Sequence, residues 1–318
     1  MSMLEVKDLH VHYETDAGVV KAVNGVSFTL EKGETLGLVG ETGAGKTTTA
    51  LALLRLVPDP PGKIVSGDIL LEGKELLKLK TSEMRKLRGE KLAMIFQDPM
   101  TALNPVMTVG DQIAEVIRLH NRGLSKAQLA IKAAEMLETV GIPADRCNEY
   151  PHQFSGGMKQ RVVIAIALAC NPDILIADEP TTALDVTIQA QVLDLIRELK
   201  NQRQTSVILI THDLGVVAEI CDKVAIMYAG EIVEIGTLEQ VYRNPVHSYT
   251  KGLFNSLPDL HKNVHRLQPI RGLMPDPMAL PEGCNFADRC DLCDASCRES
   301  KPHVVEVEPG HLVKCKKC

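Results

Sequence analysis

Residues 35–57, TLGLVGETGAGKTTTALALLRLV, decide the fold. The apolar run 35–39 predicts a buried strand, a glycine-rich turn follows it, and an apolar helix leaves the turn. From Gly40 to Thr47 the turn fits the pattern G-x-x-x-x-G-K-T. Strand, turn and helix in this order predict an α/β fold that binds a polyphosphate at the turn.

The residue types of this turn fit phosphate chemistry. Gly40, Gly43 and Gly45 allow the backbone to curl so that its N–H groups point inward. Lys46 is expected to reach the β- and γ-phosphates, and the Thr47 hydroxyl to bind Mg²⁺. We therefore expect the polyphosphate to be bound by Gly40, Glu41, Thr42, Gly43, Ala44, Gly45, Lys46, Thr47 and Thr48.

Two adjacent acids follow a second apolar run. Residues 174–177 predict a buried strand, and Asp178 and Glu179 come at its carboxyl end, where α/β sheets bind ligands. Neighbouring side chains on a strand point in opposite directions, so the two acids are expected to differ in role. Asp178 suits the Mg²⁺ shell, and Glu179 suits a general base that polarises the attacking water.

A second phosphate-binding feature lies in "FSGGMKQ", residues 154–160, ahead of an apolar helix. Ser155, Gly156 and Gly157 offer a hydroxyl, close-approach glycines and a helix N-terminus. One nucleotide needs only one such cradle. We therefore expect this second one to bind the γ-phosphate of a nucleotide held by another subunit.

Two further polar residues follow predicted strands. Gln97 comes after "AMIF" and suits the orientation of water and Mg²⁺. His212 comes after residues 207–210, and its imidazole suits contact with the γ-phosphate. Each of them, taken singly, is also compatible with an ordinary polar residue at a strand end.

Together and in this order, these motifs resemble the full set of an ABC-type ATPase domain. The resemblance covers residues 4–255 and includes residues 183–185 ("ALD"). It implies an α/β P-loop nucleotide-binding domain with a RecA-like core, an N-terminal antiparallel β-subdomain and a helical signature subdomain at about 99–169. It also implies that Tyr13 stacks on adenine, with a strand-face tyrosine as the alternative.

The same resemblance implies how the chain works with other proteins. Two ATPase subunits, identical or different, would pair head to tail around ATP, and residues 100–106 would receive a helix of a membrane permease. A substrate-binding protein would take part indirectly. The alternative for residues 100–106 is ordinary helix packing. The rival for the whole chain is a soluble ABC ATPase that does not transport and has a metal- or redox-sensing tail.

Composition limits the partners and the compartment. The net charge of −6 over 318 residues gives no reason to expect nucleic acid. The N-terminus does not read as a secretion signal, and the longest apolar run, 162–170, is far short of the ~20 residues that a membrane-spanning helix needs. These features favour a cytoplasmic chain, in which cysteines stay reduced. The resemblance implies a peripheral place on the cytoplasmic face of the cell membrane.

The C-terminal extension, residues 256–318, has a different character from the ATPase domain, 1–255. It is rich in proline at first and then carries six of the nine cysteines. We expect a small, irregular, Cys-rich arm. Its pattern resembles the C-terminal extension of ATPase subunits from oligopeptide and dipeptide, and also nickel, importers.

In that subfamily the cysteines follow C-x5-C-x6-C-x17-C, which matches Cys284, Cys290, Cys297 and Cys315. Cys293 and Cys318 lie outside the match. Four thiolates suit a [4Fe–4S] cluster, which we expect, or Zn²⁺ as the alternative. The two resemblances together imply an ATP-hydrolysing motor of a membrane importer. Its cargo is expected to be a dipeptide or oligopeptide, with nickel or another solute as the alternative.

Overall fold

The structure is a computed structural model that describes residues 2–181, 185–256 and 269–318. The chain divides into two compact units. The first unit holds Leu30–Thr35, Glu75–Thr211 and the first residues of the chain. The second holds Leu4–Thr29, Leu36–Lys74 and His212–Cys318.

The first unit contains three parallel strands in the order β6-β7-β8. They are β6 (Leu92–Ile95), β7 (Ile174–Asp178) and β8 (Ser206–Thr211). Nearly every residue of these strands is buried, which is typical of a parallel sheet covered on both faces. The strands predicted at 174–177 and 207–210 are therefore confirmed.

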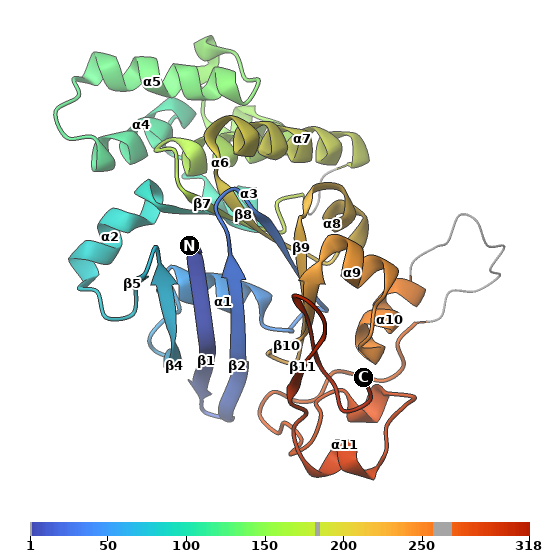
Figure 1. The fold of residues 1–318 in the computed structure, drawn as a ribbon. Helices are drawn as coiled ribbons and strands as arrows, with labels where there is room; N and C mark the ends of the chain where they lie inside the picture. Colours follow the sequence, from blue (N-terminus) through green and yellow to red (C-terminus); the bar gives the residue numbers. More distant parts are fainter. Residues whose placement is uncertain (1, 182–184, 257–268) are drawn as a thin grey trace. The chain divides into compact units, whose positions relative to one another are not determined.

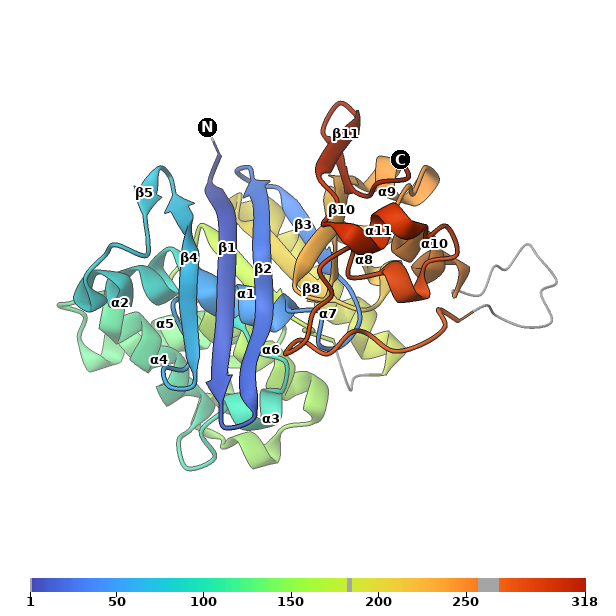
Figure 2. The same cartoon turned by 90° about the horizontal axis from the view of Figure 1, so that it is seen from below.

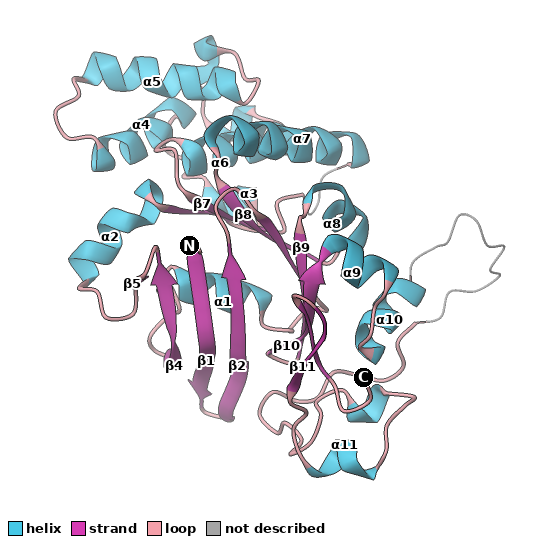
Figure 3. Ribbon diagram, viewed as in Figure 1, coloured by secondary structure: helices cyan, strands magenta, loops and turns pink. Residues whose placement is uncertain are grey.

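Helices make up most of the first unit (Figure 3). They are α2 (Thr81–Glu90), α3 (Pro99–Ala102), α4 (Val109–His120), α5 (Lys126–Thr139), α6 (Gly156–Leu168) and α7 (Val186–Arg203), with 3₁₀ turns η1 (Ala144–Asn148) and η2 (Pro151–Gln153). Ser125 caps α5 in a capping box with Gln128, and Gly141 follows its end at φ 73°. Four of these helices, α3 to α6, lie between 99 and 169, and the signature subdomain assigned to this range stays a prediction.

The second unit contains an antiparallel sheet near the N-terminus, with strand order β2-β1-β4-β5 (Figure 1). Its strands are β1 (Leu4–Thr15), β2 (Gly18–Leu30), β4 (Gly62–Leu71) and β5 (Lys74–Glu75). β1 alternates inward apolar and outward polar residues and pairs with β4, Leu4 opposite Leu71. The predicted N-terminal β-structure is confirmed.

A second sheet of this unit runs in the order β11-β12-β10-β9-β3. Its strands are β3 (Thr35–Val39), β9 (Lys223–Tyr228), β10 (Glu231–Thr237), β11 (Val304–Glu308) and β12 (His311–Lys314). The helices of the unit are α1 (Lys46–Leu53), α8 (Leu214–Ile220), α9 (Leu238–Arg243), α10 (Ser248–Asn255), the 3₁₀ turn η3 (Ala287–Arg289) and α11 (Ala295–Glu299). Strand, loop and helix at 35–53 match the prediction, and β3 lies parallel to β9.

The C-terminal arm is more ordered than the sequence analysis predicted. It contains a hairpin of β11 and β12, and β11 is labelled close to β10 in Figure 2. β12 pairs antiparallel with β10, with Val313 opposite Glu234. The signal was present in "VVEVEPGHLVK", in which two runs of β-forming residues flank a Pro-Gly turn. The hairpin adds strands to the sheet that begins with β3.

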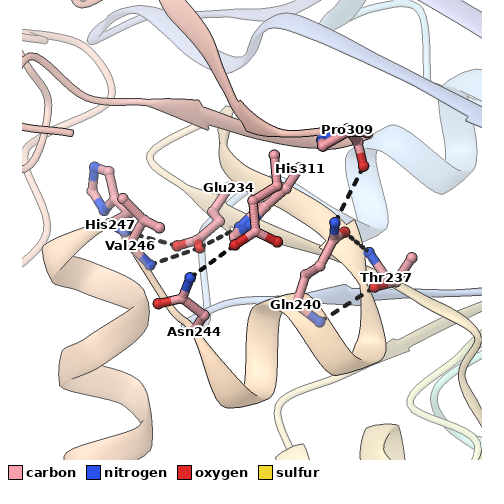
Figure 4. A network of polar contacts seen from close by, with 9 residues as sticks. Glu234, Thr237, Gln240, Asn244, Val246, His247, Pro309 and His311 are labelled. Carbon is pink, nitrogen blue, oxygen red and sulfur yellow. Dashed lines mark hydrogen bonds and ion pairs between the residues drawn. The ribbon is translucent and has the colours of Figure 1, made fainter.

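A buried polar network fastens this hairpin to the unit (Figure 4). His311 Nε2 lies 2.8 Å from Glu234 Oε1, and neither side chain is exposed to solvent. The Glu234 carboxylate also accepts hydrogen bonds from the backbone N–H groups of Val246 and His247, at 2.8 and 2.9 Å. β10, β12 and the start of α10 therefore meet at one carboxylate.

Among the described residues, no helix has the length and apolar character required to cross a membrane.

Candidate functional site

The predicted phosphate loop lies between β3 and α1 in the second unit. Lys46 begins α1 and is only 6% exposed. Its ammonium group donates hydrogen bonds to the carbonyl oxygens of Gly40, at 2.7 Å, and Glu41, at 3.0 Å. The loop is therefore curled around its own lysine, with the N-terminus of α1 directed into it.

Two positions of the loop require glycine for steric reasons. A Cβ atom on Gly40 would lie 2.2 Å from the carbonyl oxygen of Met227 on β9. Gly45 has φ 99°, and a Cβ there would lie 2.4 Å from the carbonyl oxygen of Ala22. Any larger residue at either position would displace backbone, so the cradle that the sequence predicted requires glycine here.

Tyr13 lies on β1, and its hydroxyl is 3.4 Å from Oγ1 of Thr48 on α1. Both residues belong to the second unit, so the structure brings the tyrosine to the first turn of the helix that follows the loop. This position is compatible with a base-stacking role. Stacking of Tyr13 on adenine stays a prediction.

The two acids occupy the end of β7 in the first unit. Asp178 is the last residue of the strand and is 2% exposed. Glu179 follows with φ 45°, and its backbone N–H donates to the carbonyl of Ile210 at 2.8 Å. Glu179 has a left-handed backbone and is half-buried, so the two carboxylates differ in their exposure to solvent.

Gln97 and Glu179 meet, which the sequence analysis did not foresee. Nε2 of Gln97 donates a hydrogen bond of 2.8 Å to Oε2 of Glu179. β6 and β7 are neighbours with Ile95 opposite Ala177, so residues just beyond the two strand ends come together. The signal was the pair of strand ends, but only the strand order shows that they are adjacent.

The predicted second phosphate-binding segment, residues 154–160, lies at the start of α6. Ser155 is the N-cap and accepts from the Met158 N–H at 3.4 Å, and both Ser155 and Gly156 are exposed. A Cβ on Gly156 would meet no atom within 4 Å, whereas one on Gly157 would lie 2.6 Å from Cγ2 of Ile188. Gly157 is thus required by packing against α7, and Gly156 lies on the open side of the helix end.

His212 follows β8 directly and is exposed, ahead of the Asp213 cap of α8. Its contact with a γ-phosphate stays a prediction. Of the "ALD" stretch, residues 183 and 184 lie outside the described residues. Asp185 is described and caps α7 by accepting from the Ile188 N–H at 2.9 Å.

The cysteines of the C-terminal extension lie near one another. The Cys284 N–H donates to the Cys297 carbonyl at 2.8 Å. Burial raises the pKa of the Cys284 thiol, and the nearby Cys290 and Cys297 raise it further. Burial likewise raises the pKa of Cys315 to about 11, with Cys284 and Cys290 among the neighbours that contribute.

This gathering of thiols is not a formed metal centre. Within the part of the chain that the structure describes, no group of three or more His, Cys, Asp or Glu side chains stands ready to hold a metal ion. The soft thiol donors fit iron or zinc chemically, but their arrangement does not support the [4Fe–4S] cluster or its zinc alternative. The metal site therefore stays a prediction.

Comparison with known proteins adds the family. A family model described as "ABC transporter" matches residues 23–182. A second, "Oligopeptide/dipeptide transporter, C-terminal region", matches residues 233–297. The chain belongs to the ABC transporter family, as an ATP-binding subunit.

The relatives of this ABC subunit agree in length as well as in sequence. It is 51% identical to the dipeptide transport ATP-binding protein DppD of Bacillus subtilis over 98% of this chain and 94% of that protein. It is also 51% identical to the oligopeptide transport ATP-binding protein OppD of the same organism, over 98% of this chain and 88% of that one. These matches include the C-terminal extension.

Solved structures show the same cassette fold. A dimeric post-hydrolysis state of the ATP-binding cassette MJ0796, bound to ADP and Pi, matches with a TM-score of 0.67 and 27% identity. The match covers 74% of this chain and 99% of that one. The ABC subunit is therefore an ATPase with the α/β cassette fold predicted from its motifs.

Proposed function

We propose that this ABC subunit is the motor of a membrane importer for dipeptides or oligopeptides. The observation that carries the proposal is the match of residues 233–297 to the oligopeptide/dipeptide transporter C-terminal region. The names of the relatives, dipeptide and oligopeptide transport ATP-binding proteins, point the same way. On this proposal the subunit works at the cytoplasmic face of the membrane as a peripheral partner of a permease.

The proposed ATP site consists of the phosphate loop, Tyr13 and the residues that would bind Mg²⁺. The loop at 40–48 binds the phosphates of ATP, with Lys46 on the β- and γ-phosphates and Tyr13 against adenine. Mg²⁺ would supply charge neutralisation when bound, and Thr47, Gln97 and Asp178 would hold it through their oxygen atoms. The steric need for glycine at 40 and 45 supports the cradle.

Hydrolysis is assigned to three side chains. Glu179 polarises the attacking water and accepts its proton, while Gln97 orients the carboxylate through their 2.8 Å hydrogen bond. His212 donates to the γ-phosphate and stabilises the charge that develops there. Asp178 is buried, whereas Glu179 is half-buried and accepts from Gln97, and this difference supports separate roles for the two carboxylates.

A second ATPase subunit is proposed to complete each site. Ser155, Gly156 and Gly157 of one subunit bind the γ-phosphate held by the loop of the other, and hydrolysis removes this bridge. The exposure of Ser155 and Gly156 at the N-terminus of α6 supports the arrangement. The second subunit is either a copy of this chain or a related ATPase.

The extension is proposed to bind a metal at Cys284, Cys290, Cys297 and Cys315. The proposal rests on the chemistry of four soft thiol donors and on the resemblance of their spacing to that of the importer subunits. A [4Fe–4S] cluster is proposed first and Zn²⁺ second. Either would staple a region that is rich in loops, and a bound cation would stabilise thiolates that burial alone disfavours.

The experiment is reconstitution of the subunit in proteoliposomes with the permease and the partner ATPase that co-purify with it. Uptake of a radiolabelled dipeptide is measured against uptake of Ni²⁺, each with and without ATP. ATP-dependent dipeptide uptake is expected, and it should disappear in Lys46→Ala. Nickel uptake without peptide uptake would contradict the proposed cargo, and binding to ribosomes or DNA in place of the permease would contradict the transport role.

A further inference from the structure

The C-terminal extension contacts the phosphate loop through one arginine. Arg289, the last residue of η3, forms a two-pronged ion pair with Glu41, which lies 248 positions earlier in the chain. Nη1 of Arg289 lies 3.0 Å from Oε2 of Glu41, and Nη2 lies 3.0 Å from Oε1. Both residues belong to the second unit. The paired geometry matches a planar guanidinium to a planar carboxylate, the strongest form of this interaction.

Arg289 is held firmly on its other sides. Its Nε donates to the carbonyl of Arg271 at 2.9 Å, and Nη1 also donates to the Tyr228 hydroxyl at 3.3 Å. The guanidinium lies 5.6 Å from the ring centre of Tyr228 and 5.8 Å from that of Phe286. The side chain is only 6% exposed. A buried, preorganised guanidinium of this kind holds its partner in one place.

Glu41 is in turn tied to the loop's lysine. Its backbone N–H donates to the hydroxyl of Tyr249 at 3.0 Å, and its carbonyl accepts from Lys46 Nζ at 3.0 Å. A short chain of contacts therefore runs from Arg289 through Glu41 to Lys46. The methyl group of Met274 lies beside the loop as well, since a Cβ added on Gly43 would lie 3.0 Å from Cε of Met274.

Glu41 places a negative charge in a loop that must accept a more negative ligand. Without a counter-ion, its carboxylate would repel a polyphosphate and lower the affinity of the loop. Burial by itself lowers the pKa of Arg289, but its hydrogen bonds with Glu41 and Tyr228 outweigh burial and raise that pKa, so the arginine stays charged. The ion pair cancels the repulsion and fixes the carboxylate at the rim of the loop.

We propose that Arg289 is a positioning residue for ATP binding. It neutralises Glu41 and fixes the phosphate loop, so the C-terminal extension sets the affinity of the subunit for nucleotide. The proposal rests on the proposed role of the loop at 40–48 in binding ATP.

The test uses the full-length subunit, with ATP Kd from isothermal titration and KM and kcat from steady-state ATPase kinetics. Arg289→Ala is expected to raise Kd and KM for ATP about tenfold, the order expected for one uncompensated charge near the phosphates. The value of kcat should stay within about twofold, because no reacting atom is touched. Adding Glu41→Gln to Arg289→Ala should restore most of the lost affinity, since the repulsive charge is then gone.

Arg298→Ala is the matched control. Arg298 lies in the same extension and pairs with Asp288, but its side chain is 59% exposed and contacts no loop residue in the described structure. Its replacement should leave Kd unchanged. Arg289→Lys keeps the charge but not the planar guanidinium, so its affinity for ATP is expected to lie between those of the wild type and Arg289→Ala. This variant tests the proposal even if Arg289→Ala folds poorly.

Two outcomes would overturn the proposal. The first is an unchanged affinity for ATP in Arg289→Ala, and the second is a double variant, Glu41→Gln with Arg289→Ala, that binds ATP as weakly as Arg289→Ala alone. The second would mean that the arginine supports only the fold of the extension. The variant Lys46→Ala distinguishes an error in the role of Arg289 from an error in the role of the loop. If Lys46→Ala binds ATP as the wild type does, the loop assignment is wrong and the proposal falls with it; if it loses binding while Arg289→Ala does not, only the role of Arg289 is wrong.

Discussion

Gln97 and Glu179 are joined by a hydrogen bond of 2.8 Å from the amide nitrogen to the carboxylate. The two residues lie 82 positions apart and follow the neighbouring parallel strands β6 and β7. An amide donor held against a carboxylate limits the directions in which that carboxylate can accept a proton. The contact therefore links the residue proposed to orient water with the one proposed to polarise it.

Glu179→Gln is expected to slow ATP turnover by about 10²–10⁴-fold, the usual contribution of a general base. The amide keeps the size of the side chain, so ATP binding should stay within about twofold. Phosphate release and nucleotide titration on the purified subunit measure the two quantities. Glu198→Gln, at an exposed position of α7, is the control. Turnover near the wild-type rate in Glu179→Gln would show that another group activates the water.

Gln97→Glu tests the contact itself. It places a second carboxylate within hydrogen-bonding distance of Glu179, and two such groups cannot both ionise cheaply. We expect at least a tenfold loss of turnover at neutral pH and a pH–rate profile that differs from that of the wild type. Gln97→Asn, which stays neutral but is shorter, should lose less. Identical profiles for Gln97→Glu and the wild type would argue against coupling between the two residues.

His311→Leu is expected to destabilise the second unit by about 3 kcal/mol, because Glu234 would stay buried without its partner. Urea unfolding followed by circular dichroism measures the change. His303→Leu is a matched control, since His303 is exposed just before β11. The carboxylate keeps its bonds from the Val246 and His247 N–H groups, so the subunit should still fold. Equal stabilities of the two variants would count against the buried pair as a fastening point.

The burial of His247 predicts that the folded protein loses stability in acid. Burial lowers its pKa from 6.5 to about 4, so the folded state resists protonation while the unfolded state takes up a proton below about 6.5. This contribution to stability is complete above pH 6.5 and is lost as the pH falls towards 4. It amounts to about 3 kcal/mol in total.

The measurement for His247 is the free energy of unfolding at several pH values between 7.5 and 4.5. Its ring nitrogen accepts from the Tyr249 N–H at 3.1 Å, so His247→Asn keeps a capping acceptor for α10. That variant should show a flatter dependence of stability on pH. An unchanged slope would assign the acid sensitivity to other groups.

The proposed metal site predicts a difference between two neighbouring cysteines. Cys297→Ser should reduce bound iron or zinc by at least about tenfold, whereas Cys293→Ser, outside the proposed set, should retain it. Elemental analysis and visible absorption after anaerobic purification measure both. A colourless protein that contains zinc would rule out the cluster. Wild-type protein free of both metals would remove the site.

The link between the extension and the phosphate loop predicts an effect of metal loss on nucleotide binding. Cys290 follows Arg289 directly in the chain. If a metal holds Cys290, Cys290→Ser should weaken ATP binding in the same direction as Arg289→Ala, by a smaller factor. ATP titration of Cys290→Ser beside Cys293→Ser measures this. Equal affinities for ATP in the two variants would show that the metal does not influence nucleotide binding by the loop.

Local features were predictable where short stretches of sequence determine structure. The strand at 35–39, the loop at 40–47 and the helix after it agree with the structure because glycine conformation, strand burial and helix capping act between near neighbours. Ser125 and Gly141 mark the limits of α5 for the same reason. The C-terminal hairpin was missed, although its alternating valines and Pro-Gly turn were visible, because the cysteines and prolines around it favoured an irregular arm.

The sequence by itself determined the ATPase motif set, the order of the strands and helices that carry it, and the resemblance to peptide transporter subunits. Only the tertiary structure decided that Gln97 contacts Glu179, that Gly157 packs against Ile188, and that Arg289 reaches Glu41. The physical reason is separation along the chain. Propensity and periodicity act over a few residues, whereas these contacts depend on which strands and loops are neighbours in space.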